Sequence, residues 1–451
     1  MNKIPTFKLT VQFSNQIKNA IEQSDDQFII NSLKDINPAD ICSLLEELNV
    51  DESKYVVDLM DLEIRAQIIN GLEPETQKLL LKKYFPEELS EILNYLDSDD
   101  VADILNNLPT KKKEEVLVGI DAELALQVID LLRYEENEAG GLMAKEVIKA
   151  NINWSVVQCV EEIRKQAETV TKLYTVFVVD KNDKLMGTVA LHDIVIADAN
   201  KLVADILDEE VISVETFLSE KEVADIMQKY DLESVPVVNV QGQLVGRITI
   251  DDILDVISQQ ADTERQLMSG ISEDIENSNN IWKNTRARLP WLIIGIIGGM
   301  LSARFIGLFE LELSKVTAIA FFVPLIQATG GNVGIQSSSI IVQRLANSNF
   351  KMERIWKRFT KVILVALLNG AFLAVFVLCG NWLIFRNNQL SLIVSCALFF
   401  VVIIASLIGT ITPIILNYFN VNPALASGPF ITTINDLTGL SVYFAAIHLM
   451  L

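Results

Sequence analysis

Asp436 is the residue of this chain whose setting most strongly suggests chemistry. It is the only acidic residue after Glu353, and no Lys or Arg follows Arg386, so nothing close in sequence neutralises its charge. A carboxylate in the middle of a membrane span costs about 2.5–3.5 kcal/mol on insertion scales, and such acids are functional sites by default. Asp436 is therefore either a cation ligand facing a wet cavity, or a structural acid that is protonated or paired with a residue such as Arg304.

Two polar segments in the same half of the chain add further oxygen atoms. The segment 324–337 (PLIQATGGNVGIQS) is expected to interrupt its helix and to free backbone carbonyls. Free carbonyls are tolerated at membrane depth only where protein or water satisfies them. The segment 422–429 (NPALASGP) opens the last apolar stretch, shortly before Thr432, Thr433 and Asp436. Carbonyl and amide oxygens suit a hard, hydrated cation, although small and polar residues also let membrane helices pack closely.

The elements that must position these residues are membrane spans. Half of the 451 residues are hydrophobic although the net charge is −22, and the two properties separate along the chain. Acids dominate up to about residue 280, whereas residues 290–451 are apolar with few charges. A helix needs about 20 mostly apolar residues to cross a bilayer. Five stretches qualify: 290–309, 316–342, 362–385, 391–416 and 423–450.

The distribution of Lys and Arg predicts the orientation, because cytoplasmic loops retain these residues. Lys283, Arg286 and Arg288 precede the first span, whereas the loops after spans one and three offer only Lys315 and Arg386. The loop between spans two and three holds further cations: Arg344, Lys351, Arg354, Lys357, Arg358 and Lys361. The N-terminal part is therefore expected in the cytoplasm and the C-terminus outside, as an odd number of spans requires.

Composition disfavours several other classes of protein. The acidic balance argues against nucleic-acid binding, which needs clustered Lys and Arg. The four cysteines form no CxxC pair and there are two histidines, so neither a zinc site nor a disulfide framework is indicated. No GxxxxGK[ST] motif and no nucleophile–base pair is found, so an ATP-driven pump and an enzyme are both disfavoured.

Residues 150–258 contain an internal repeat. Gly187 and Gly246 are separated by the same offset of 59 positions as Asp193 and Asp252. One constant offset across a strand, a turn and a helix indicates a true repeat. Each unit is predicted to form two strands followed by a helix, and this β-β-α arrangement looks like a tandem CBS pair, a small α+β module that senses ligands.

The second unit contains a segment, 246–252 (GRITIDD), that is similar to the CBS pattern in which Thr and Asp contact a nucleotide. Thr249 and Asp252 are the matching residues, and ATP at the CBS pair is the cofactor that this pattern implies. The alternative is that both residues cap the following helix. Ala190 occupies the Thr position in the first unit, so two equivalent nucleotide sites are not expected.

Residues 20–135 are predicted to form short helices around turns at Pro38, Pro74, Pro86 and Pro109. Acidic helix starts followed by Leu-rich faces favour a small α superhelix, in which repeats that are unstable alone stack into one core. Residues 259–282 are predicted to form a polar helix that connects this cytoplasmic half to the spans.

The order of these parts resembles the MgtE family of bacterial Mg2+ channels and transporters over nearly the whole chain. Three segments carry the resemblance: 134–143 (YEENEAGGLM), 329–336 (TGGNVGIQ), and 422–429 followed by Asp436. The resemblance implies a multi-domain fold, with an α-helical superhelix over 1–135, a tandem α+β CBS pair over 136–258 (about 136–200 and 201–258), a long connecting (plug) helix over 259–284, and an all-α transmembrane domain of five spans over 285–451.

The resemblance implies a homodimer in the bacterial inner membrane that takes up Mg2+ through a pore on its two-fold axis. Two Asp436 carboxylates would then bind a Mg2+ that keeps several of its waters. The implied pore residues are Asp436, Asn332, Gln336, Asn422 and Thr432. The family also implies a gate, in which cytoplasmic Mg2+ bridges acids and closes the pore, and the acids repel each other when Mg2+ falls. The acids expected to act as sensors are Asp99, Asp103, Asp231, Asp252, Asp255 and Glu264.

The chain departs from the family pattern in the pore and in the gate. Asn422 stands where the family usually has Asp, which removes one charge from the cytoplasmic end of the pore. Ser219, Lys221, Gln260 and Thr263 stand where the family pattern has acids. The gate is therefore expected to be weaker than in relatives, or to use other acids.

Two other functions stay open at this point. The pore could carry Mn2+, Co2+ or Ca2+, although no His, Cys or Met near Asp436 favours a soft metal. The chain could also be a non-transporting membrane sensor, whose CBS pair reports Mg2+ or nucleotide to a partner. Such a sensor would not need Asp436.

Overall fold

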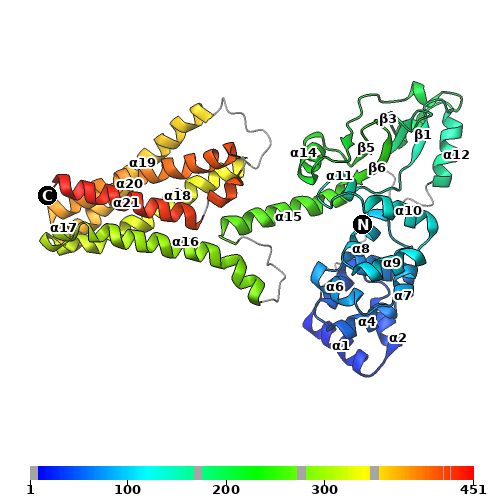
Figure 1. Ribbon diagram of the computed structural model, residues 1–451, viewed down its shortest axis with the longest axis horizontal. Coiled ribbons are helices and arrows are strands. Elements are labelled where there is room, and N and C mark those ends of the chain that lie inside the picture. The colour runs from blue at the N-terminus through cyan, green and yellow to red at the C-terminus, as the bar shows by residue number, and fades with distance from the viewer. Residues whose placement is uncertain are drawn as a thin grey trace, which may run out of the picture. The chain divides into compact units, whose positions relative to one another are not determined.

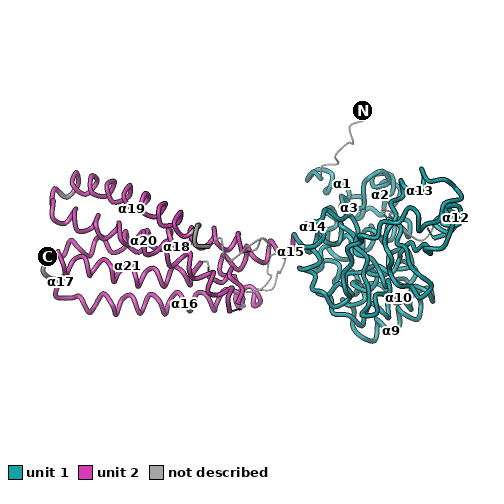
Figure 2. The backbone as a smooth tube through the Cα atoms, turned by 90° about the horizontal axis from the view of Figure 1, so that it is seen from above, with its two compact units in different colours: residues 1–257 teal, residues 258–451 magenta. Residues whose placement is uncertain are grey.

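The chain, seen in a computed structural model, divides into two compact units, residues 1–257 and 258–451 (Figure 2). The structure describes residues 9–166, 175–271, 281–345, 355–419, 421–426 and 428–450. Each unit contains its own hydrophobic core.

Short helices form the first part of the first unit (Figure 1). Pro38, Pro74 and Pro86 are the first residues of α3, α6 and α7, and Pro109 directly precedes α9. Proline suits these positions because the first turn of a helix leaves its N–H groups unpaired. The bounds are α1 (Val11–Glu22), α2 (Asp26–Leu33), α3 (Pro38–Leu45), α4 (Val50–Asp58), α5 (Leu62–Gly71), α6 (Pro74–Leu81), α7 (Pro86–Leu93), α8 (Ser98–Asn106), α9 (Thr110–Gly119) and α10 (Ala122–Leu131).

These helices stack so that most contact the second helix further along the chain. α3 packs on α5, α5 on α7, α7 on α9, α4 on α6, and α8 on α10. Their buried faces are aliphatic, as Leu44, Ile69 and Leu93 illustrate. The predicted α superhelix is confirmed: each helix covers the apolar face of a neighbour that would be unstable alone.

Two three-stranded sheets confirm the predicted tandem α+β pair. In each sheet the first strand is parallel to the second, and the second is antiparallel to the third. Gly187 lies opposite Val178 and Gly246 opposite Val237, and a register shift follows each pair. The repeat read from the sequence is therefore also a structural repeat. Its elements are β1 (Lys149–Asn151), α12 (Val156–Gln166), β2 (Thr175–Val179), β3 (Leu185–Ala190), α13 (Leu191–Ile196), β4 (Val214–Glu215), α14 (Glu220–Tyr230), β5 (Ser234–Val238), β6 (Leu244–Thr249) and α15 (Ile250–Met268).

The segment 134–143 joins the helical part to the second sheet. It contains the short helix α11 (Ala139–Leu142), and the N–H of Gly140 donates to the carbonyl of Thr216 at 2.8 Å. A Cβ built on Gly140 would overlap the ring of Tyr134. Glycine is therefore required where the chain folds back on this tyrosine.

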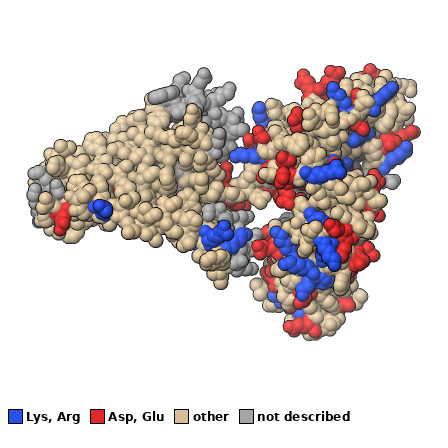
Figure 3. Space-filling view, in the orientation of Figure 1, with Lys and Arg blue, Asp and Glu red and all other residues tan. Residues whose placement is uncertain are grey.

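The second unit contains, among the described residues, five helices long and apolar enough to cross a membrane: Ile281–Gly307, Thr317–Leu345, Phe359–Ile384, Asn388–Tyr418 and Pro429–Met450. The predicted five-span architecture is confirmed. Figure 3 shows that the visible face of this unit carries very few charged side chains, whereas acids and bases are dense on the other unit. The elements are α16 (Ile281–Gly307), α17 (Glu310–Lys315), η2 (Thr317–Phe322), α18 (Val323–Leu345), α19 (Ile355–Phe385), α20 (Asn388–Tyr418), η4 (Pro423–Ala426) and α21 (Pro429–Met450).

The centre of this unit is formed by α18, α20 and α21. The fully buried Tyr443 of α21 donates its hydroxyl to the carbonyl of Ile319 at 2.9 Å. The hydroxyls of Ser337 on α18 and Ser406 on α20 lie 3.1 Å apart and share a hydrogen bond. α16 packs on α21, and α19 packs on α20.

Two expectations about helix continuity were wrong. Segment 324–337 does not interrupt its helix, because α18 is continuous from Val323 to Leu345 and Pro324 lies in its first turn, where a missing N–H removes no helical hydrogen bond. The connecting helix is also divided differently. α15 runs on from the CBS pair and ends at Met268, and residues 281–284 are the first turn of α16.

Candidate functional site

The half-buried Asp436 lies on α21 against the backbone of α18. A Cβ built on Gly331 would lie 3.9 Å from Oδ1 of Asp436 and 3.2 Å from Cγ2 of Thr432. The missing side chain of Gly331 therefore lets α21 approach and leaves the carboxylate beside the α18 backbone. The hydroxyl of Thr432 donates to the carbonyl of Gly428 at 3.0 Å, so it is already used within its own helix.

A structural ion pair does not account for Asp436. Within the described ranges, no ion pair joins its carboxylate to a Lys, Arg or His, and no charged group acts on it from nearby. Arg304, the partner that the sequence suggested, is exposed near the end of α16. The structural interpretation through Arg304 therefore loses its support, and the cation-ligand interpretation is favoured.

The other predicted pore residues do not close a site within one chain. Asn332 and Gln336 are exposed and lie four residues apart on α18, hence on one face of the helix. Asn422 is also exposed, and its Oδ1 accepts a hydrogen bond from the N–H of Ala424 at 2.9 Å, which caps η4. A single chain thus places Asp436 and Thr432 together and leaves the three amides accessible.

Asn435 was missed by reasoning from sequence, although it directly precedes Asp436. It is 1% exposed, and its side-chain oxygen and nitrogen have no hydrogen-bond partner in the part of the chain that the structure describes. The available signal in the sequence was an amide within an apolar stretch. The charge of the adjacent Asp436 was the stronger signal, and Asn435 was therefore overlooked.

A cluster of carboxylates forms a second candidate site, in the first unit. Asp99, Asp100 and Asp103 extend from α8, Asp252 from the first turn of α15, and Glu146 from the segment after α11. The hydroxyl of Ser98 donates to Glu146 at 2.9 Å. Oδ1 of Asp99 is buried, and no described residue donates a hydrogen bond to it. Three of the predicted sensor acids, Asp99, Asp103 and Asp252, are therefore brought together.

Burial and like charge raise the pKa values of these carboxylates. Burial, and then the charges of Asp100 and Asp252, raise the pKa of Asp99 well above its usual range. Burial raises the pKa of Asp100 to about 6. Asp103 stays exposed at the rim, yet desolvation by surrounding groups and the charges of Asp100, Glu136 and Asp252 raise its pKa to about 7. The cluster stores electrostatic repulsion that a cation would relieve.

The donor atoms suit Mg2+, which prefers carboxylate oxygens and retains waters. As they stand, no three His, Cys, Asp or Glu side chains among the described residues are arranged to hold a metal ion directly. A Mg2+ at this cluster would therefore be bound partly through its waters, or after small side-chain movements.

The remaining predicted sensor acids lie outside the cluster. Asp231 ends α14 with a φ of 52°, and Asp255 is exposed on α15. Neither is among the charges that act on Asp99, Asp100 or Asp103. Glu264 belongs to the second unit, at the far end of α15.

Thr249 and Asp252 form a helix cap. Oδ2 of Asp252 accepts hydrogen bonds from the hydroxyl of Thr249 at 2.7 Å and from its N–H at 3.2 Å. Thr249 is 8% exposed. The hydrogen bonds of this pair are therefore those of the capping alternative. In the first sheet, Ala190 lies opposite Thr175 at the position equivalent to Thr249.

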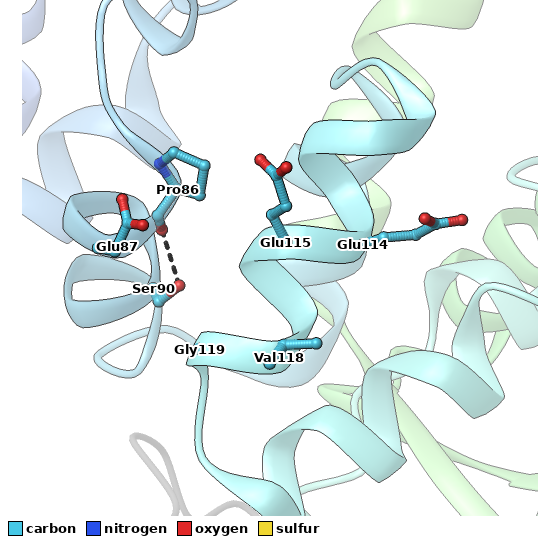
Figure 4. A pocket seen from close by; sticks show the side chains of 7 residues that line it. All are labelled: Pro86, Glu87, Ser90, Glu114, Glu115, Val118 and Gly119. Atoms are coloured by element: carbon cyan, nitrogen blue, oxygen red, sulfur yellow. Dashed lines mark hydrogen bonds between the residues drawn. The ribbon is translucent and has the colours of Figure 1, made fainter.

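A shallow groove of about 440 Å³ lies between α7 and α9 (Figure 4). Ser90 donates its hydroxyl to the carbonyl of Pro86 at 2.7 Å, a bond internal to α7. Glu115 points toward Pro86, whereas Glu114 points away from it (Figure 4). The carboxylates do not converge, so this groove offers no joint binding site for a cation.

Comparison with known proteins finds three matching domain families along the chain. Residues 36–137 match the family described as the MgtE intracellular N domain, and residues 139–200 and 203–259 match the CBS domain. Residues 323–446 match MgtE, described as a divalent cation transporter.

Individual relatives agree over most of the chain. The magnesium transporter MgtE of Thermus thermophilus is 36% identical over 338 residues, which cover 74% of this chain and 74% of that protein. The magnesium transporter MgtE of Enterococcus faecalis is 34% identical over 325 residues, 72% of this chain and 71% of that protein. A crystal structure of the cytosolic domain of the Mg2+ channel MgtE in complex with ATP is similar with a TM-score of 0.52 and 33% identity, covering 54% of this chain and 99% of that one. With this identity, this coverage and the matching order of domains, the chain belongs to the MgtE family.

Proposed function

We propose that this protein is a Mg2+ channel or transporter for magnesium uptake, with Asp436 as the ion-binding residue of its pore. The observation that carries the proposal is a half-buried acid on a membrane-spanning helix, beside Gly331 and without a cationic partner among the described residues. The relatives named above are magnesium transporters. The accessible amides of Asn332 and Gln336 would line the route, and Asn422 and Thr432 would stand at its cytoplasmic end.

The proposed assembly is a homodimer in a bacterial inner membrane, with the N-terminus in the cytoplasm and the C-terminus outside. One chain leaves Asn332 and Gln336 uncovered on a span, where amides in contact with lipid are unfavourable. A second copy across a two-fold axis would convert this face into a wet route. Lys283, Arg286 and Arg288 in the first turns of α16 support the orientation.

The proposed gate is the carboxylate cluster of α8 and α15. Cytoplasmic Mg2+ would neutralise Asp99, Asp103 and Asp252 and hold residues 1–135 against the CBS pair over 136–258. The last turns of α15, which ends at Met268, would transmit this state toward the pore domain, residues 285–451. ATP is proposed as a second ligand of the CBS pair, supported by the ATP complex of the similar cytosolic domain. To bind it, Thr249 would exchange its bond to Asp252 for one to the nucleotide.

The test of the pore is Mg2+ flux into liposomes containing the full-length protein. Asp436→Ala is expected to lower the flux at least tenfold, equivalent to about 1.4 kcal/mol, and Asp436→Asn is expected to retain less than half. Glu310→Gln is the matched control, since Glu310 is an exposed acid of the same unit outside the spans. Equal flux in all variants would exclude a pore at Asp436 and favour the sensor function. Replacing Mg2+ by Mn2+, Co2+ or Ca2+ in the same liposomes identifies the ion.

A further inference from the structure

Asn435 is a fully buried amide in the second turn of α21, one residue before Asp436. Its Oδ1 and Nδ2 lack hydrogen-bond partners among the described residues. Burying an unpartnered amide costs free energy, and polar residues inside membrane helices commonly have a role. The position of the side chain indicates what that role is.

The amide of Asn435 occupies the space over Gly334 of α18. A Cβ built on Gly334 would overlap Nδ2 of Asn435 and would lie 2.9 Å from its Cγ. α18 also lies close to α20, because a Cβ on Gly409 would overlap the carbonyl of Gly334 and lie 3.0 Å from Cβ of Ser337. Gly334 is thus in close contact with both α20 and the side chain of Asn435.

The contact of Asn435 with Gly334 also determines where Asp436 lies. Gly331, about one turn before Gly334, is the α18 residue beside Asp436 and Thr432. Successive residues of a helix point about 100° apart, so the rotation of α21 that seats Asn435 on Gly334 sets the direction of the Asp436 carboxylate.

We infer that Asn435 is a positioning residue of the ion route: its amide, seated on Gly334, fixes the rotation of α21 against α18 and holds Asp436 beside Gly331. The inference rests on the proposed role of Asp436 in the pore. It assigns a function to a buried amide.

The first test adds a methyl group at Gly334 and then removes the side chain of Asn435 with which this methyl group would clash. Gly334→Ala is expected to lower Mg2+ flux about tenfold, equivalent to about 1.4 kcal/mol, because the new Cβ displaces Asn435. Adding Asn435→Ala is expected to restore part of the flux; the methyl of Ile431, 2.9 Å from the new Cβ, limits the recovery. Gly439→Ala is the matched control on α21, since its Cβ would have 3.6 Å to the nearest atoms, and its flux is expected to stay unchanged.

The second test reads the rotation of α21 without conduction. The native cysteines, Cys42, Cys159, Cys379 and Cys396, are first replaced by Ala. The rate at which a charged methanethiosulfonate modifies the thiol introduced by Asp436→Cys is then measured, with and without Gly334→Ala. We expect this rate to change several-fold with Gly334→Ala and to return toward its starting value with Asn435→Ala added.

The outcomes separate the two proposals. Normal flux in Asp436→Ala would overturn the pore assignment, while the thiol rates would still report on the rotation. If Gly334→Ala leaves the thiol rate unchanged and lowers only the melting temperature, Asn435 is a packing residue and the positioning inference is wrong. Failure of Asn435→Ala to reverse the effect of Gly334→Ala on the thiol rate would also overturn it.

Discussion

At the scale of residues, two neighbouring polar side chains of α21 meet different surroundings. Asn435 is enclosed by α18, whereas Asp436 is only half-buried and stands beside a glycine. A buried amide stays neutral at every pH, but a carboxylate carries charge that a cation can compensate. The difference in burial therefore supports a helix-positioning role for Asn435 and an ion-binding role for Asp436.

Asn422 allows a test of charge at the proposed cytoplasmic end of the route. Asp and Asn are comparable helix caps, so Asn422→Asp is expected to keep η4 capped and to change the free energy of unfolding by less than about 0.5 kcal/mol. The added charge should lower the Mg2+ concentration that gives half-maximal flux in liposomes, by about two- to threefold at low salt.

Asn422→Ala serves as the control, because it removes the cap without adding charge. It is expected to cost about 1 kcal/mol of stability and not to lower the half-saturating Mg2+ concentration. If Asn422→Asp and Asn422→Ala shift that concentration equally, charge at this position has no part in ion binding.

At the scale of elements, the carboxylate cluster of α8 and α15 makes stability depend on pH. The folded-state pKa values of Asp100 and Asp103, about 6 and about 7, exceed the ordinary value of 3.8. The folded protein therefore binds more protons than the unfolded chain between about pH 4 and 7. The stabilising effect of protonation is present at low pH and is lost as pH rises through this window.

The melting temperature of the full-length protein in detergent with EDTA is expected to fall by a few degrees between pH 5 and pH 7.5. Added Mg2+ should raise it more at pH 7.5 than at pH 5, because protons already neutralise the cluster at the lower pH. The double variant Asp99→Asn, Asp103→Asn should melt higher in EDTA at pH 7.5 and respond less to Mg2+. An equal Mg2+ response at both pH values, or in this variant, would refute a Mg2+ site at the cluster.

At the scale of the whole molecule, the accessible amides on α18 suggest that a second copy of the chain covers this helix. Asn332 and Gln336 are exposed, whereas the exposed residue Phe376 of α19 is apolar and lies on a helix that packs on α20. Lipid accommodates phenylalanine at little cost but not an unpaired amide. The face of α18 is therefore the expected meeting surface of two copies.

A cross-link tests this assembly directly. In membranes, with the native cysteines replaced, the thiol introduced by Asn332→Cys is expected to form an intermolecular disulfide upon mild oxidation, giving a dimer on a non-reducing gel. The thiol introduced by Phe376→Cys, on the lipid-facing side, is expected to stay monomeric. The homodimer with α18 at its axis is wrong if Phe376→Cys cross-links as readily as Asn332→Cys.

Features that depend on local sequence could be predicted well. The five spans follow from continuous apolar length, and the tandem sheets follow from a constant offset between Gly187 and Gly246. The continuity of α18 could not be read in the same way. A proline followed by paired glycines is compatible with a broken helix, and only the packing of Gly331 and Gly334 against α21 shows that these glycines serve close approach.

The sequence by itself determined that an acid-rich half precedes five apolar spans and that Asp436 is the only acid in those spans, because both features follow directly from the order of residues along the chain. Only the tertiary structure decided which acids meet: Asp99 and Asp252 lie on helices far apart in sequence, and their proximity depends on how α8 packs near the start of α15. Only the tertiary structure, likewise, placed Asn435 on Gly334, because that contact depends on the rotation of one helix against another, and no single segment encodes it.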